Sequence, residues 1–204
     1  NGVMVAKVLI SDGQRRGSLF VPMHWNNQFA RQGRVNNLLA AVTDPHSGQP
    51  ESKQVAVAIA AWLPAWHGEL FCRQPVTLPE WLHWRRRAAV GLTHLSLAGD
   101  KSPRAWLTDW CQRQGWQVQI AEAGALWNLL AWHEGALMLG WWSDAREPEV
   151  ESEWIIAAFS SPPATAELRH ALLSGRKGGD IAPRGRIICS CFSVGERAIV
   201  EAIA

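Results

Sequence analysis

The stretch LWNLLAWHEGALMLGWW (residues 126–142) decides the fold class of the region around it. Apolar residues dominate on both sides of Glu134–Gly135, and a glycine after a polar residue favours a tight turn. Apolar runs that meet at such a turn are typical of neighbouring antiparallel strands. The pattern therefore predicts a β-hairpin centred on Glu134–Gly135.

The segment before the hairpin carries a helix signal. Ser102–Pro103 supplies an N-cap and a first-turn residue, and Gly115 supplies a stop. Between these ends, the large or apolar side chains recur at helical spacing: Trp106, Leu107, Trp110 and Cys111. The spacing predicts a helix over 103–115 and places Cys111 in the core, where a thiol acts as a small apolar group and not as a metal ligand.

Further segments on both sides complete this region. Strands are predicted at 92–99, 116–124 and 153–159. Ser161, Pro162 and Pro163 start a predicted helix over 164–175. This mixture of elements predicts a small connecting α+β domain over about 61–165.

The stretch 166–186 is expected to hold a helix and a linker, because SGRKGGDIAPRGR (174–186) is rich in glycine and charge. The connecting domain shows no catalytic constellation in its sequence. Its scattered histidines are interpreted as structural or surface residues: His67, His83, His94 and His133.

Composition excludes several classes of function. The 204 residues are 48% hydrophobic and 19% charged, and the net charge of +2 is too small to indicate a nucleic acid or an anionic membrane as partner. No apolar run approaches the ~20 residues that span a bilayer. Four cysteines are too few for a disulfide framework in a chain of this length, so a reducing compartment is expected. The 13 tryptophans are expected in cores or domain interfaces.

The first third of the chain has a different pattern. Apolar segments predict strands at 3–10, 18–23 and 54–63, and long polar loops separate them. The loops carry the turn signals Asp44–Pro45 and Ser47–Gly48. Strands joined by long polar loops fit a β-barrel whose loops line a site.

The end of the chain carries a C-x-C pair, Cys189 and Cys191. Alternate residues of an extended segment point the same way, so both thiols can reach one metal ion. Ser193 and Glu196 form a capping box for a predicted helix, whose N-terminus would favour an anionic cluster nearby. An iron–sulfur cluster needs four ligands. The pair alone leaves open an iron–sulfur site, a zinc or copper site, and two inert thiols.

The residues around the C-x-C pair favour the iron–sulfur site. GRIICSCFSVGERAIVEAI (185–203) closely resembles the start of the bacterioferritin-associated ferredoxin-like 2Fe–2S domain. The resemblance implies that Cys189 and Cys191 are two ligands of a 2Fe–2S cluster in a helical domain that starts at 187–204. It also implies that a closing C-x-x-C pair follows beyond Ala204.

A second resemblance concerns the polar loops. The stretch 17–59, with FVPMHW, VNNL and DPHSGQPE, is similar to the C-terminal dinucleotide-binding domain of molybdopterin oxidoreductases. Assimilatory nitrate reductases are most similar, and formate dehydrogenases come next. The match covers 1–59 and implies an incomplete double-psi β-barrel over 1–60. It further implies that Asn36, Lys53 and His24 contact a bis-molybdopterin guanine dinucleotide cofactor.

Together the resemblances imply a fragment of a cytoplasmic nitrate reductase that is inactive alone. Nitrate would be reduced to nitrite at molybdenum. Electrons would arrive from a flavoprotein subunit or a ferredoxin, and a 4Fe–4S cluster is expected in a preceding part of the protein. The alternatives are a formate dehydrogenase or another molybdopterin oxidoreductase, and a non-catalytic metal-binding or interaction module.

Overall fold

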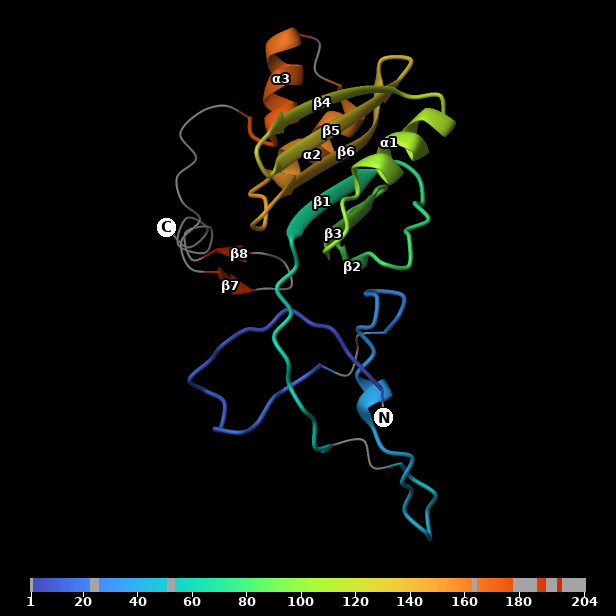
Figure 1. Cartoon of the computed structure of the whole chain (residues 1–204), viewed down its shortest axis with the longest axis vertical. Coiled ribbons are helices and arrows are strands. Elements are labelled where there is room, and N and C mark those ends of the chain that lie inside the picture. The colour runs from blue at the N-terminus through green and yellow to red at the C-terminus, as the bar shows by residue number, and fades with distance from the viewer. Residues whose placement is uncertain are drawn as a thin grey trace.

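The structure, a computed structural model, describes residues 2–22, 26–50, 54–162, 165–177, 187–189 and 194–195 of the chain. Antiparallel strands form a six-stranded sheet in the order β2-β3-β1-β6-β5-β4 (Figure 1). The strands are β1 (Trp66–Cys72), β2 (His83–Arg87), β3 (Thr93–Gly99), β4 (Gln117–Ala123), β5 (Leu126–His133) and β6 (Ala136–Asp144). The predicted α+β class is confirmed for this region, and β1 and β2 are strands that the sequence patterns did not indicate.

The predicted hairpin is confirmed as β5 and β6. Glu134 and Gly135 connect the strands, and both have positive φ angles, 49° and 79°. Positive φ at both central residues is the geometry of a two-residue turn that matches the twist of the flanking strands. The predicted strands at 92–99 and 116–124 are confirmed as β3 and β4.

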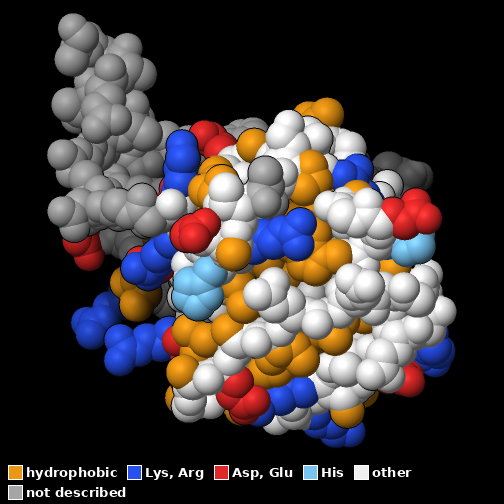
Figure 2. Space-filling view, turned by 90° about the horizontal axis from the view of Figure 1, so that it is seen from above, with side chains coloured by type: hydrophobic (Ala, Val, Ile, Leu, Met, Phe, Trp, Pro, Cys, Tyr) orange, Lys and Arg blue, Asp and Glu red, His pale blue; other side chains and the backbone are white. Residues whose placement is uncertain are grey.

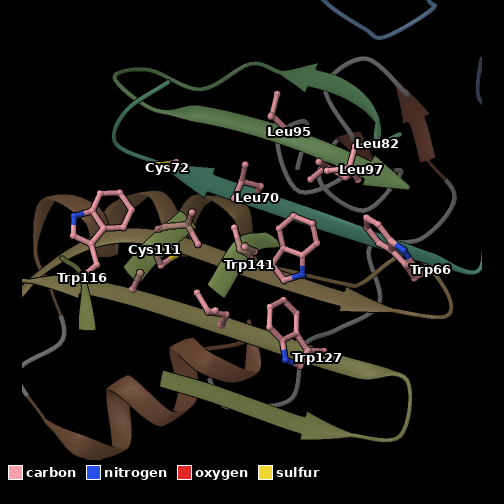
Figure 3. Close-up of a cluster of buried hydrophobic side chains, with 14 residues drawn as sticks. Trp66, Leu70, Cys72, Leu82, Leu95, Leu97, Cys111, Trp116, Trp127 and Trp141 are labelled. Atoms are coloured by element: carbon pink, nitrogen blue, oxygen red, sulfur yellow. The ribbon is translucent and has the colours of Figure 1, made fainter. Parts of the chain in front are cut away.

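Three α-helices cover the two faces of the sheet. They are α1 (Arg104–Arg113), α2 (Ser152–Ser160) and α3 (Ala166–Ser174). Buried Leu107 and Cys111 of α1 pack on one face with Leu70 and Trp141, as Figure 3 shows for the cluster around Cys111, Leu70 and Trp141. Helices α2 and α3 cover the other face, where a second cluster surrounds Phe71.

Tryptophans fill much of this interior, as their abundance predicts. Those that are buried are Trp66, Trp116, Trp127, Trp132, Trp141 and Trp142. Trp66 and Trp127 both lie against Trp141, with ring centroids 5.6 and 6.3 Å from it. Fully burying an apolar side chain of this size stabilises a fold by about 2 kcal/mol or more.

The predicted strand at 153–159 is wrong, because this segment forms helix α2. Its buried residues are Ile155, Ala158 and Phe159, which recur with the spacing of a helix face and not with strand alternation. Arg73 of the chain after β1 holds the end of α2, donating to the carbonyl oxygen of Phe159. The apolar residues of this short segment fit either a helical or a strand period, and tertiary packing selected the helix.

The predicted helix at 164–175 is confirmed as α3. The Thr165 hydroxyl accepts a hydrogen bond from the Leu168 N–H over 3.3 Å, and Gly175 ends the helix with φ of 79°. Buried Leu172 and Leu173 attach α3 to the sheet.

The predicted strands at 3–10, 18–23 and 54–63 are wrong for the residues described there, 3–10, 18–22 and 54–63. These segments lie below the sheet in Figure 1 without a strand or helix of their own. Their apolar side chains are exposed, among them Ile10 (90%), Phe20 (74%) and Leu63 (88%). A strand needs a hydrogen-bonded neighbour, and within the described residues these segments have no ladder partner.

Near the chain end, β7 (Ile187–Cys189) pairs antiparallel with β8 (Val194–Gly195). The sequence predicts a helix after Ser193, so Val194 and Gly195 differ from that prediction. The rest of the predicted helix falls outside the described residues. No helix in the described ranges is long and apolar enough to cross a membrane.

Candidate functional site

Asn36, a predicted cofactor contact, lies in the short 3-10 helix η1 (Val35–Leu38). The backbone N–H of Leu39 donates to the carbonyl oxygen of Asn36 over 3.3 Å and closes this turn. The Asn36 side chain is exposed, and no described residue hydrogen-bonds its amide. Within the described part of the chain, its donors and acceptor are therefore left for a bound molecule.

The first residues of the chain run beside η1. The N–H of Gly2 donates to the carbonyl oxygen of Asn37 over 2.7 Å, and the N–H of Val5 donates to that of Gln32 over 3.0 Å. A Cβ atom on Gly2 would lie 2.4 Å from the Asn37 oxygen, so a larger residue would force the two segments apart. Backbone pairing thus supports η1 from one side.

Residues 26–38, called the polar loop below, turn tightly before η1. Ala30 is only 7% exposed, and Gly33 packs so closely on it that a Cβ atom on Gly33 would lie 2.7 Å from the Ala30 Cβ. Gln32 between them adopts a positive φ of 54°. The polar loop therefore has a small buried anchor although most of its side chains are exposed.

The anchor of the polar loop pairs with the edge of the sheet. Ala30 lies opposite Arg85 of β2 in an antiparallel bridge. The N–H of Arg31 donates to the Trp84 carbonyl over 2.9 Å, and the N–H of Arg86 donates to the Phe29 carbonyl over 2.7 Å. A segment from the first third of the chain is thus joined to the α+β region through backbone groups.

Asp44 organises a second polar turn at the predicted breaker. Its Oδ1 accepts hydrogen bonds from the Ser47 N–H at 2.7 Å, the Ser47 hydroxyl at 2.9 Å and the His46 N–H at 3.0 Å. These bonds, led by the one from the Ser47 backbone, hold the pKa of the Asp44 carboxyl below its usual value. The turn signal in the sequence thus corresponds to a hydrogen-bonded turn.

The other predicted site residues are only partly covered by the structure. His24, Lys53 and Cys191 lie outside the described residues. The backbone of Cys189 ends β7, whereas nothing is described of its side chain. Among the predicted ligands, the structure therefore describes a side chain only for Asn36, and it tests no contact between them.

Cys72 and Cys111 are buried in the sheet core as free thiols. Burial raises the pKa of Cys72 to about 11 and that of Cys111 to about 12. A thiol with so high a pKa is a poor ligand and nucleophile at neutral pH. The interpretation of Cys111 as a core residue is confirmed.

The structure also shows a polar cluster that sequence reasoning missed. Glu69 of β1 accepts from the Ser96 hydroxyl at 2.8 Å, and its other oxygen lies 2.8 Å from Nε2 of buried His94. The carboxylate takes both partners, so serine is not activated by histidine as nucleophilic catalysis requires. Among the described residues, no group of three or more His, Cys, Asp or Glu side chains could hold a metal ion.

Strand pairing brings this cluster together. Glu69 lies opposite Ser96, and Phe71 lies opposite His94, whose ring stacks on Phe71 with centroids 3.9 Å apart. The register between β1 and β3 could have revealed the cluster. The sequence of β1 gave no strand signal strong enough to define that register. His94 is thus a structural histidine, in agreement with the prediction, and His133 is exposed.

A known protein family and a known protein are similar in sequence to this chain. Residues 1–56 match the molybdopterin dinucleotide binding domain family. The chain is also 78% identical over 203 residues to a protein of Klebsiella oxytoca named nitrate reductase. That alignment covers 100% of this chain and 23% of the relative, so the chain spans about a quarter of the length of the relative it matches. No solved structure matches the chain significantly.

These matches confirm the resemblance to nitrate reductases and to their dinucleotide-binding domain. The family match ends at residue 56, whereas β1 begins at Trp66, and it includes the polar loop, η1 and the Asp44 turn. The 2Fe–2S resemblance of the last residues is not tested by either comparison. Asn36 lies within this family match and in the described part of the chain, and its contact with a cofactor stays a prediction.

Proposed function

We propose that this chain is part of a molybdenum-dependent assimilatory nitrate reductase that reduces nitrate to nitrite. The observation that carries the proposal is the 78% identity over the whole chain to a nitrate reductase. The family match of residues 1–56 supports a role in binding the molybdopterin dinucleotide. The exposed apolar side chains at 3–10, 18–22 and 54–63 would be covered by the rest of the enzyme.

Asn36, Lys53 and His24 are proposed to hold the bis-molybdopterin guanine dinucleotide. The fit is supported by the exposed Asn36 amide, which can donate to and accept from a pterin edge. A lysine at position 53 supplies a point charge that suits an anionic cofactor. The bound cofactor would supply the redox chemistry at molybdenum, while the residues of this chain would bind and orient it.

Cys189 and Cys191 are proposed as two ligands of a 2Fe–2S cluster at which electrons enter. Cys189 ends strand β7, and Cys191 follows two positions later in the sequence. Electrons would come from a flavoprotein subunit or a ferredoxin in the cytoplasm. Replacing Cys189 by Ser in the full-length enzyme should abolish or alter the 2Fe–2S signal in electron paramagnetic resonance, while leaving the molybdenum content unchanged.

The cofactor contacts are tested by Asn36→Ala and Lys53→Ala in the full-length enzyme, with exposed Lys101→Ala as control. A lost neutral hydrogen bond, as at Asn36, costs about 0.5–1.5 kcal/mol, or a roughly two- to tenfold weaker hold on the cofactor. A lost hydrogen bond of a charged group, as at Lys53, costs about 1.5–3 kcal/mol, or a roughly ten- to hundredfold weaker hold. Because the cofactor is large, other contacts will spread part of this loss. Normal molybdenum content and normal nitrate turnover in both variants would contradict the assignment of these residues.

The family match alone also fits a formate dehydrogenase or another molybdopterin oxidoreductase. Assays with nitrate and formate separate these possibilities, because formate oxidation without nitrate reduction would favour the dehydrogenase. A chain that binds zinc or copper through its C-x-C pair, with no molybdenum in the full-length protein, would indicate a non-catalytic module.

A further inference from the structure

We propose that the six-stranded sheet positions the polar loop through its edge strand β2 and is therefore a positioning element of the molybdopterin site. This inference rests on the proposed function, because it assumes that the polar loop faces the cofactor. It assigns a role to the α+β region that follows residues 1–56, the part that matches the dinucleotide-binding family.

The first support is the backbone pairing at the sheet edge. Strand β2 pairs with β3 on one side, and its other side accepts the polar loop at Ala30. The hydrogen bonds from Arg31 and Arg86 flank this bridge at 2.9 and 2.7 Å. An edge strand presents unpaired backbone groups that fix the register of a segment laid along them.

The second support is the short path from this bridge to Asn36. Gly33 packs on Ala30, and the Asn37 N–H donates to the Arg34 carbonyl over 3.2 Å as η1 begins. Little flexible chain remains between the bridge and η1. A shift of the bridge would therefore move the Asn36 amide relative to its ligand.

The third support comes from segments on either side of the polar loop, which also contact the sheet region. Nζ of Lys7 lies 2.6 and 2.7 Å from the carboxylate oxygens of Glu147. Further along the chain, the Trp62 Nε1–H donates to Asp100 over 3.1 Å, and the Trp62 ring lies 4.4 Å from that of His83. An exposed ion pair alone stabilises little, but these contacts restrain the chain on both sides of the polar loop.

The test uses Arg86→Pro in the full-length enzyme, with Arg86→Ala as its matched control. Both variants remove the same exposed side chain, but only proline removes the N–H that donates to Phe29. This N–H points away from β3, so the β2–β3 ladder keeps its hydrogen bonds. Hydrogen exchange of residues 29–38, molybdenum content and the KM and kcat for nitrate are measured for each variant.

Arg86→Pro is expected to speed exchange at residues 29–38 about two- to tenfold, the effect of one backbone hydrogen bond. It should also lower molybdenum content or raise the KM for nitrate, whereas Arg86→Ala should match the wild type. Faster exchange with unchanged molybdenum and unchanged kinetics would overturn the inference and leave the proposed function intact. Unchanged exchange would likewise overturn it.

A second variant keeps the test decisive if Arg86→Pro fails to fold. Asp100→Ala removes the acceptor for Trp62 and for the Ala65 N–H, which lies 3.2 Å away, without touching the polar loop. The inference predicts a smaller change of the same kind in exchange and molybdenum content, and no change in either would overturn it. A wild-type enzyme without molybdenum would instead overturn the proposed function, and this inference with it.

Discussion

At the scale of single residues, burial decides the chemistry of the cysteines. Helical spacing predicted Cys111 as a core residue, and the structure confirms it beside Cys72. Loss of solvation raises both thiol pKa values, and Cys72 also raises the pKa of Cys111. By contrast, the pairing of Glu69 with Ser96 and His94 depends on strand register, which local patterns do not contain.

Cys72 and Cys111 are therefore expected to resist alkylation in the folded chain. Thiolate is the reactive form, and with pKa values of about 11 and about 12 almost none exists at pH 8. Iodoacetamide labelling followed by peptide mass spectrometry should show these thiols reacting far more slowly in the native chain than in urea. Equal rates in both conditions would contradict their burial.

At the scale of elements, the sequence predicted helices and strands correctly where a glycine marks a turn or a helix end. It did not predict the structure of short apolar runs that lack such a residue. Glu134–Gly135 and Gly175 fixed the hairpin and the end of α3 because both places require positive φ. The run at 153–159 lacks such a signal, and its apolar residues fit a strand or a helix. Contacts with the sheet made by Ile155, Ala158 and Phe159 selected the helix.

Lysine substitutions in α2 distinguish these two structures. In the helix, Ala158 is buried and Ala157 is exposed, whereas a strand with Ile155 and Phe159 facing inward would bury Ala157 instead. Ala158→Lys should destabilise the chain by several kcal/mol, since it buries an unpaired charge, and Ala157→Lys should change stability by less than about 0.5 kcal/mol. Urea denaturation measures both, and the reverse order would restore the strand interpretation.

The three apolar segments at the front show a different limit of sequence reasoning. Their β-branched residues indicate strands, but a strand exists only with hydrogen-bonding neighbours. The Val5 N–H donates to the Gln32 carbonyl, and Val8, Leu9 and Ile10 stay exposed. The sequence therefore showed the local preference of these segments for extended structure. The neighbouring strands that this structure requires are not found within the described residues.

At the scale of the whole molecule, two unlike regions share one chain. The α+β region has a hydrophobic cluster on each face of its sheet. The view in Figure 2 shows hydrophobic side chains near the centre of one side of the molecule, with charged ones mostly around them. The described residues of the first part of the chain, 2–22, 26–50 and 54–63, instead expose many apolar side chains and contact β2, Asp100 and Glu147. The connecting region was predictable as α+β, but its support of the polar loop appeared only in the structure.

The chain is 78% identical to a nitrate reductase but spans only about a quarter of its length, so cofactor binding is tested on the full-length protein. If residues 1–56 help to hold a molybdopterin guanine dinucleotide, that protein must carry the cofactor when purified from cells supplied with molybdate. Cells supplied with tungstate instead provide the control, because tungsten can replace molybdenum in the cofactor without supporting the same redox chemistry.

The most direct test is therefore to release the bound cofactor with acid and to measure molybdenum and guanine nucleotide in the same sample. We expect both to be present in the protein from molybdate-grown cells, together with reduction of nitrate to nitrite, and we expect tungstate to abolish this activity. A correctly folded full-length protein that contains neither molybdenum nor guanine nucleotide would contradict this expectation.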